Sequence, residues 1–176
     1  KTSIDKAVAG GVVVSVAAGN EADDACKYAP AFVPSAITVA ASARGDQVAS
    51  FTNYGKCTDI WAPGKDITSA GVNSDSSTDT MSGTSMACPH VSGGAAVILG
   101  FNPGFSAKQV LDTMLKYASD GKIQGNKPNT PNKLLYVEAG MGEGGGGAAR
   151  TITTARWLAR TITTARWLAR TITTAR

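Results

Sequence analysis

Ser85 lies in a segment of small residues, GTSMACPH (83–90), at the start of an apolar run that continues to Gly100. If a helix begins here, the serine is near the positive end of the helix dipole and near backbone N–H groups that have no partner. Both features stabilise negative charge that develops beside the hydroxyl. The position suits a nucleophilic serine, although a capping or buried serine has the same signature and is commoner for a serine taken alone.

His90 is the single histidine of the chain, and it follows Ser85 by five residues. Because an α-helix has 3.6 residues per turn, this spacing directs the two side chains away from each other. We therefore expect His90 to pack or to form a local hydrogen bond, and not to act as a base for Ser85. Cys88 is one helical turn from Ser85. We expect it to be a small buried hydrophobe rather than a second nucleophile.

Helical and strand patterns alternate along residues 1–139. Continuous β-branched runs are typical of strands covered on both faces, and spaced apolar residues between a capping residue and a glycine predict helices. The strands expected are 12–19, 36–42, 59–64, 66–70 and 132–139, the helices expected are 3–9, 84–99 and 106–118, and 75–80 is expected to be a polar turn. The alternation predicts an α/β fold with a parallel sheet and flanking helices. Its central helix, which carries Ser85, has small residues around most of its circumference and can be buried all round.

The composition changes after residue 139. Residues 140–149 are rich in glycine, as in a flexible linker, and residues 150–176 repeat the decapeptide TITTARWLAR without drift. Core and surface positions diverge in packed repeats, so we expect this tail to be disordered or marginally helical. Its arginines and tryptophans offer a surface for nucleic acid, an interpretation that we do not favour.

The net charge of +4 also comes from the tail, which holds six arginines and no acidic residue. Residues 1–149 carry a balance of −2 and give no reason to expect a polyanionic partner. No apolar run is long enough to span a membrane, and we expect no membrane partner. Because the chain starts with Lys1 inside an expected helix, we expect further residues upstream, where any targeting signal would lie.

Two of the three cysteines, Cys26 and Cys57, lie in polar, turn-rich segments, whereas Cys88 lies in the apolar run. Two such loops can meet, which favours a disulfide between Cys26 and Cys57 and an oxidising compartment. Three reduced thiols are the alternative that composition leaves open.

Two motifs resemble those of the subtilisin-like serine proteases, the subtilases. GTSMACPHVSGGAA (83–96) is similar to their nucleophile motif, and VVVSVAAGN (12–20) is similar to their oxyanion segment. The segments between them follow the order and approximate spacing of the proteinase K and aqualysin-like branch, so that the resemblance covers about residues 3–137. It implies a partial subtilisin-like fold and a serine endopeptidase without a catalytic cofactor. Ser85 would form the acyl-enzyme, and Asn20 would donate to the oxyanion beside the Ser85 N–H.

The resemblance implies further roles. Small residues would line the substrate site: Ala17, Ala18 and Gly19 as one wall of the S1 pocket, with Gly83 and Thr84 near the serine. Structural calcium would be held by the carbonyls of Pro34 and Ala36 and the carboxylate of Asp59, an oxygen-only set that suits this ion. A capping or solvated role is the alternative for Asp59. The positions of Cys26 and Cys57 match a disulfide of the aqualysin-like branch.

In subtilases the catalytic aspartate and histidine both precede the serine, in segments upstream of the oxyanion asparagine. Neither segment is in this sequence. We therefore interpret residues 1–139 as the C-terminal portion of a catalytic domain, secreted and inactive alone, whose parent acts on polypeptide substrates and has a pro-segment as inhibitor. The alternative is a noncatalytic pseudoprotease or interaction module with a basic tail.

Overall fold

The computed structural model describes residues 1–138 and Met141. Predictions for the rest of 139–176, the linker and the repeat tail, lie outside the described residues. Three α-helices are present in the described part: α1 (Thr2–Ala9), α2 (Thr84–Phe101) and α3 (Ala107–Tyr117). The strands are β1 (Ser15–Ala17), β2 (Ile37–Ala43), β3 (Gln47–Val48), β4 (Ile60–Pro63), β5 (Ile67–Ala70), β6 (Thr78–Met81), β7 (Ser119–Asp120) and β8 (Lys133–Leu134).

The central sheet has the order β1-β2-β4-β8-β7, and β3 pairs with β2 off this path. Strands β1, β2, β4 and β8 pair in parallel, whereas β3 and β7 pair antiparallel. The register places Ser15 opposite Ile37 and Val39 opposite Ile60. The predicted α/β fold with a parallel sheet is therefore confirmed. β1 and β8 are shorter than expected: β1 covers 15–17 of the predicted 12–19, and β8 covers 133–134 of the predicted 132–139, of which 139 lies outside the described residues.

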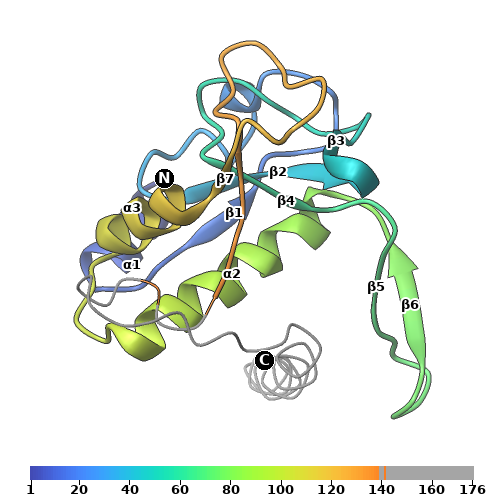
Figure 1. Cartoon of the computed structure of the whole chain (residues 1–176). Helices are drawn as coiled ribbons and strands as arrows, with labels where there is room; N and C mark the ends of the chain where they lie inside the picture. Colours follow the sequence, from blue (N-terminus) through green and yellow to red (C-terminus); the bar gives the residue numbers. More distant parts are fainter. Residues whose placement is uncertain (139–140, 142–176) are drawn as a thin grey trace.

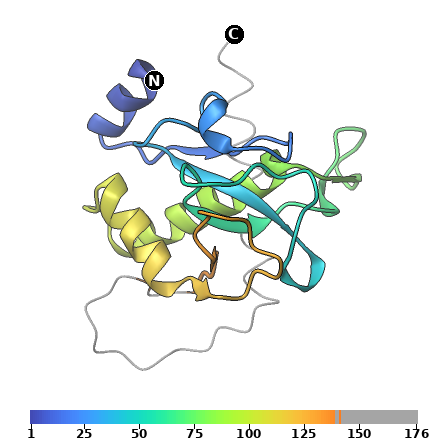
Figure 2. The same cartoon turned by 90° about the horizontal axis from the view of Figure 1, so that it is seen from above.

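Helix α2 packs across β1, β2 and β4 and also contacts α3 (Figure 1). The core between these layers is apolar: Ile37, Val39, Ala41, Ile60 and Ala62 of the sheet, Ala87, Val91, Ala95 and Ile98 of α2, and Val110 and Met114 of α3. Met141 joins this core and its carbonyl accepts a hydrogen bond from Asn102, although the sequence analysis assigns it to the linker. Figure 2 shows α1 well apart from α3, and α1 has no buried residue.

Helix α2 is buried on one face, which corrects the expectation that it is buried all round. Thr84, Ala87, Val91, Gly94, Ala95 and Ile98 are buried, whereas Ser85, Pro89, His90, Ser92, Ala96 and Gly100 are exposed. The reason is that the sheet and α3 cover only one side of the helix within residues 1–138. Small residues on the other side are compatible with burial but do not require it.

Residues 75–80, expected to be a polar turn, are partly a strand. β6 pairs antiparallel with β5 to make a two-stranded ribbon outside the central sheet, so β5 is not part of the parallel sheet (Figure 1). The capping box expected at the start of α3 is present, with hydrogen bonds between Ser106 and Gln109 in both directions. In the described part of the chain, no helix is long and apolar enough to cross a membrane.

Candidate active site

The carboxyl end of β1 meets the N-terminus of α2 through Asn20 and Thr84. The backbone N–H of Thr84 donates to Asn20 Oδ1 at 2.9 Å, and the Thr84 hydroxyl donates to the same oxygen at 3.0 Å. The N–H of Gly19 in turn donates to Thr84 Oγ1 at 3.2 Å. The structure thus brings Asn20 to the helix turn that carries Ser85.

These bonds fix the orientation of the Asn20 amide. A backbone N–H only donates, so the atom facing Thr84 must be the carbonyl oxygen, and the NH₂ group is left to donate elsewhere. A Cβ built on Gly83 would lie 3.7 Å from Asn20 Nδ2 and 3.7 Å from the backbone nitrogen of Ser85. Met86 Sδ lies at the same distance, so a Cβ at Gly83 would be in ordinary van der Waals contact with all three atoms.

The Ser85 N–H is the unpaired donor of the first turn of α2. Thr84 donates to Asn20, and the N–H groups of Met86 and Ala87 donate to the Gly83 carbonyl at 3.0 and 3.3 Å. Within residues 1–138, neither the N–H nor the hydroxyl of Ser85 has a hydrogen-bond partner, and the residue is exposed. The first turn of α2 therefore carries an exposed serine with a free N–H at the positive end of a helix, and Asn20 is bonded to the residue before it.

His90 lies on the exposed side of α2, with Nδ1 2.9 Å from the carbonyl oxygen of Met86. This is the local hydrogen bond that we expected, and it directs the ring toward the backbone of its own helix. Cys88 is half-buried, and its thiol donates to Ser15 Oγ at 3.3 Å. Burial raises the pKa of the Cys88 thiol, so the thiol stays protonated at neutral pH and is a poor nucleophile.

The residues expected to contact substrate differ in exposure. Ala18 is fully buried in a small cluster with Ala25 and Ala31. Ala17 and Gly19 are half-buried, and Gly83 is buried. Thr84 is buried, and its hydroxyl is engaged by Asn20 and Gly19. These bonds tie the first turn of α2 to the loop that carries Asn20.

Asn53, which the sequence analysis did not identify as a functional residue, is fully buried and hydrogen-bonds to the loop that carries Asn20. It lies in ASFTNYGK, in a turn between strands, where an asparagine is common. Its partners are 30–35 residues away along the chain, so local sequence carries no signal for them.

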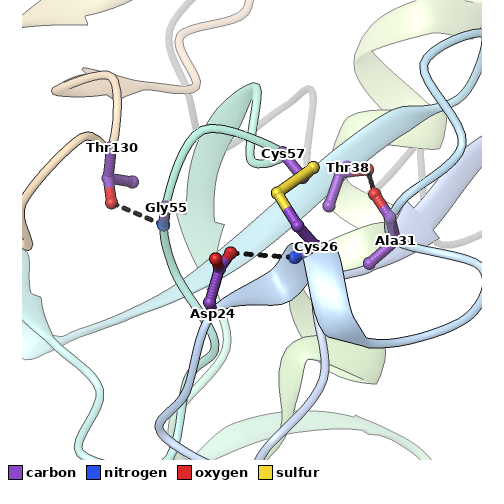
Figure 3. The surroundings of a disulfide bond; sticks show 7 residues. All are labelled: Asp24, Cys26, Ala31, Thr38, Gly55, Cys57 and Thr130. Carbon is purple, nitrogen blue, oxygen red and sulfur yellow. Dashed lines mark hydrogen bonds between the residues drawn. A yellow bond between two sulfur atoms is a disulfide. The ribbon is translucent and has the colours of Figure 1, made fainter.

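The predicted disulfide between Cys26 and Cys57 is present, with the two Cα atoms 5.3 Å apart (Figure 3). It joins the short 3₁₀ turn Ala25–Lys27 to the loop before β4. The carboxylate of Asp24 caps this turn by accepting a hydrogen bond from the Cys26 N–H at 2.9 Å. The link closes a loop of 31 residues, which on the chain-entropy model stabilises the fold by about 3–4 kcal/mol.

Of the oxygens expected to hold calcium, those of Asp59 lie beside the start of β2. Asp59 Oδ2 accepts a hydrogen bond from the Thr38 N–H at 2.7 Å, and no ion pair to Asp59 is seen in the described residues. Burial raises the pKa of the Asp59 carboxyl, which the Thr38 N–H offsets only in part. Within 1–138, the carbonyls of Pro34 and Ala36 accept no hydrogen bond. A half-buried carboxylate with two free carbonyls fits a hard cation.

Comparison with known proteins gives consistent results. The family model described as the subtilase family matches residues 1–159. An extracellular serine proteinase of Thermus sp. is 48% identical over 136 residues, which are 77% of this chain and 33% of that protein. A cuticle-degrading serine protease of Arthrobotrys oligospora is 41% identical over 136 residues, again 77% of this chain and 33% of that protein.

A solved structure agrees with these sequence relatives. The crystal structure of a cold adapted subtilisin-like serine proteinase superposes with a TM-score of 0.74 at 42% identity, over 78% of this chain and 50% of that chain. The chain therefore spans about a third of the length of these curated relatives and half of that solved chain.

Proposed function

The chain belongs to the subtilase family, and from this we propose that it forms the nucleophile and oxyanion side of a serine endopeptidase active site. The observation that carries the proposal is the pairing of Asn20 with the first turn of α2, where Gly83 adjoins both Asn20 Nδ2 and the unpaired Ser85 N–H. The substrates proposed are polypeptides, and a pro-segment inhibitor is proposed with them. Both relatives named above are serine proteinases by name, and one is called extracellular, which supports secretion of this protein too.

In this mechanism Ser85 Oγ attacks the scissile carbonyl and the carbonyl oxygen becomes an anion. The anion is stabilised by two hydrogen bonds, one from Asn20 Nδ2 and one from the Ser85 N–H. Both donors are already oriented before substrate arrives, so little reorganisation is needed in the transition state. In subtilisin, removal of the oxyanion asparagine lowers kcat by about 10²- to 10³-fold.

The general base is proposed to come from residues outside this sequence. His90 is the single imidazole of the chain, and it is bonded to the Met86 carbonyl instead of the serine. No carboxylate among the described residues contacts the Ser85 hydroxyl. In subtilisin, loss of the base histidine lowers kcat by about 10⁶-fold, so we propose that these 176 residues alone are inactive.

We propose a structural calcium ion bound by the carbonyls of Pro34 and Ala36 and the carboxylate of Asp59. Calcium would neutralise a half-buried carboxylate that lacks an ion-pair partner within the described part of the chain. It would also tie the loop before β2 to the residue before β4. The chemistry supplied is structural stabilisation, since no group of the active site contacts these oxygens in residues 1–138.

Labelling of the complete protein with a fluorophosphonate tests the proposal, because the probe reacts only with an activated serine. We expect wild type to be labelled, Ser85→Ala not to be labelled, and His90→Ala to be labelled in its folded fraction. Absence of labelling in folded wild type would favour the noncatalytic alternative. Equal and complete loss in Ser85→Ala and His90→Ala at matched folding would contradict the roles given to the two residues.

A further inference from the structure

Asn53 lies in the loop between β3 and β4, where it is fully buried. Its side chain uses all four of its hydrogen-bonding positions on the segment 18–23. Nδ2 donates to the Ala18 carbonyl at 3.0 Å and to Glu21 Oε2 at 2.7 Å. Oδ1 accepts from the N–H groups of Glu21 and Asp23, both at 3.0 Å.

The partners of Asn53 bracket Asn20 on both sides along the chain. Two of them, Ala18 and Glu21, are within two residues of it, and the backbone N–H of Asn53 also donates to the Gly19 carbonyl at 2.9 Å. A single buried residue therefore holds the backbone immediately before and after the oxyanion asparagine. The bond to Glu21 is charge-assisted, which makes it shorter and stronger than a neutral amide contact.

Gly19 shows how closely the Asn53 amide approaches this loop. Its φ is +104°, and a Cβ there would contact Asn53 Nδ2 and lie 2.7 Å from Glu21 Oε2. The loop thus takes a conformation that favours glycine, and it does so at the point of contact with Asn53. Thr84 holds the Asn20 side chain itself, through Oδ1.

We infer that Asn53 is a positioning residue for the oxyanion site, which fixes the backbone around Asn20 so that Asn20 Nδ2 stays aimed at the space beside the Ser85 N–H. This inference rests on the proposed function. Asn53 touches no reacting atom, and its effect passes through Asn20. Loss of its bonds leaves the backbone on both sides of Asn20 free to shift, and a displacement of about 1 Å at Asn20 Nδ2 is enough to cost a large part of such stabilisation.

A double-mutant cycle in the complete protein separates positioning from general stability. We expect Asn53→Ala to lower kcat for a peptide substrate by about 10- to 100-fold with KM within about 2-fold, below the loss for Asn20→Ala. In an Asn20→Ala background, Asn53→Ala should change kcat by less than about 2-fold. Equal losses of kcat in both backgrounds would overturn the inference.

Two control variants match the chemistry of Asn53. Asn132 clamps another loop with its side-chain amide, accepting from the Ile123 N–H at 2.9 Å and donating to the Ile123 carbonyl at 3.1 Å. Asn132→Ala should lower the melting temperature without lowering kcat. Glu21→Gln keeps an acceptor for Asn53 Nδ2 and should stay within about 2-fold of wild-type kcat.

Hydrogen exchange of the Thr84 N–H provides a second readout that needs no activity, because this group donates to Asn20 Oδ1. Its protection should fall in Asn53→Ala and persist in Asn132→Ala. If Asn53→Ala does not fold, Glu21→Ala, which removes one of the four side-chain bonds of Asn53 at an exposed position, serves instead. Unchanged protection would overturn the inference, even in a protein that no fluorophosphonate labels.

Discussion

Two segments adjoin the N-terminus of α2, one through hydrogen bonds and one along the chain, and they are attached to the rest of the protein in different ways. The loop 18–24 has almost no regular secondary structure, but it is tied to the body by Asn53, Thr84 and the nearby disulfide. The β5–β6 ribbon is regular and reaches α2 along the chain, yet all of β6 is exposed, and Val72 at its turn is 99% exposed. Figure 1 shows the ribbon projecting from the sheet.

This contrast shows that regular backbone pairing does not by itself fix a site in place. The ribbon is joined internally by its ladder and by a hydroxyl pair, Thr68 and Thr80 at 2.8 Å, and these bonds do not attach it to the core. The loop is attached by bonds between residues 30 or more apart in the chain, and each of these crosses from one element to another. We expect the loop to be sensitive to substitution and the ribbon to be tolerant.

Removal of the disulfide should produce the largest loss of stability. Cys26→Ser with Cys57→Ser is expected to lower the free energy of unfolding by about 3–4 kcal/mol, because the unfolded chain regains the freedom of a 31-residue loop. Urea denaturation measures this loss. Cys88→Ser is the matched control, since Cys88 is unpaired and a serine keeps a donor for Ser15. A loss below about 1 kcal/mol would show that the disulfide contributes little to the free energy of unfolding.

Gly19→Ala should follow, with a loss of about 2–4 kcal/mol from backbone strain and from displacement of the Asn53 amide. Gly45 also has positive φ, +72°, but a Cβ there meets nothing within 4 Å. Gly45→Ala therefore isolates the backbone cost, about 1–2 kcal/mol. Equal unfolding free energies for the two variants would show that the contact with Asn53 contributes nothing.

Asp59→Asn tests the calcium proposal and its pH dependence. Because burial raises the pKa of Asp59 in the folded protein, its favourable contribution is fully present below the unfolded pKa and is lost as pH rises through the folded pKa. At pH 7 in chelator, the asparagine variant should be at least as stable as wild type. Calcium at 100 times its dissociation constant should stabilise wild type by about 2.7 kcal/mol and the variant not at all. Equal calcium shifts in thermal melts of the two proteins would refute the site.

Val72→Ser should have the smallest effect, within about 0.5 kcal/mol, because the side chain is almost fully exposed on the ribbon. Fluorophosphonate labelling of the complete protein should also be unchanged. A clear fall in labelling at unchanged stability would mean that the ribbon takes part in the site, and the contrast between the two segments would then be wrong.

The parts of the fold that the sequence predicts are those with strong local patterns. The apolar run 36–42 predicts β2 because a strand covered on both faces needs continuous apolar residues, and the Ser106–Gln109 box predicts the start of α3 for the same local reason. β6 escapes prediction, since its residues are polar and exposed and only backbone pairing with β5 makes it a strand.

The residues of the candidate site also fall into two groups, those with a local sequence signal and those without one. Ser85, Asn20 and the Cys26–Cys57 pair were accessible through short motifs and a family resemblance, and the rejection of His90 followed from helix geometry. The interior position of Ala18 and the clamp made by Asn53 were not accessible. Both depend on which loops meet in three dimensions, and no spacing in the sequence encodes that meeting.

The covalent tie also has a consequence for the unfolded chain. Cys26 follows Asn20 by six residues, and Cys57 follows Asn53 by four. The oxidised chain therefore keeps both asparagines near the disulfide even when the rest of the chain is unfolded. The path that must close to bring them together shrinks from 33 residues to about 10, which lowers the entropic penalty of their meeting by about 1 kcal/mol. In an oxidising environment, Asn53 and the segment 18–23 are therefore already close together when the chain begins to fold.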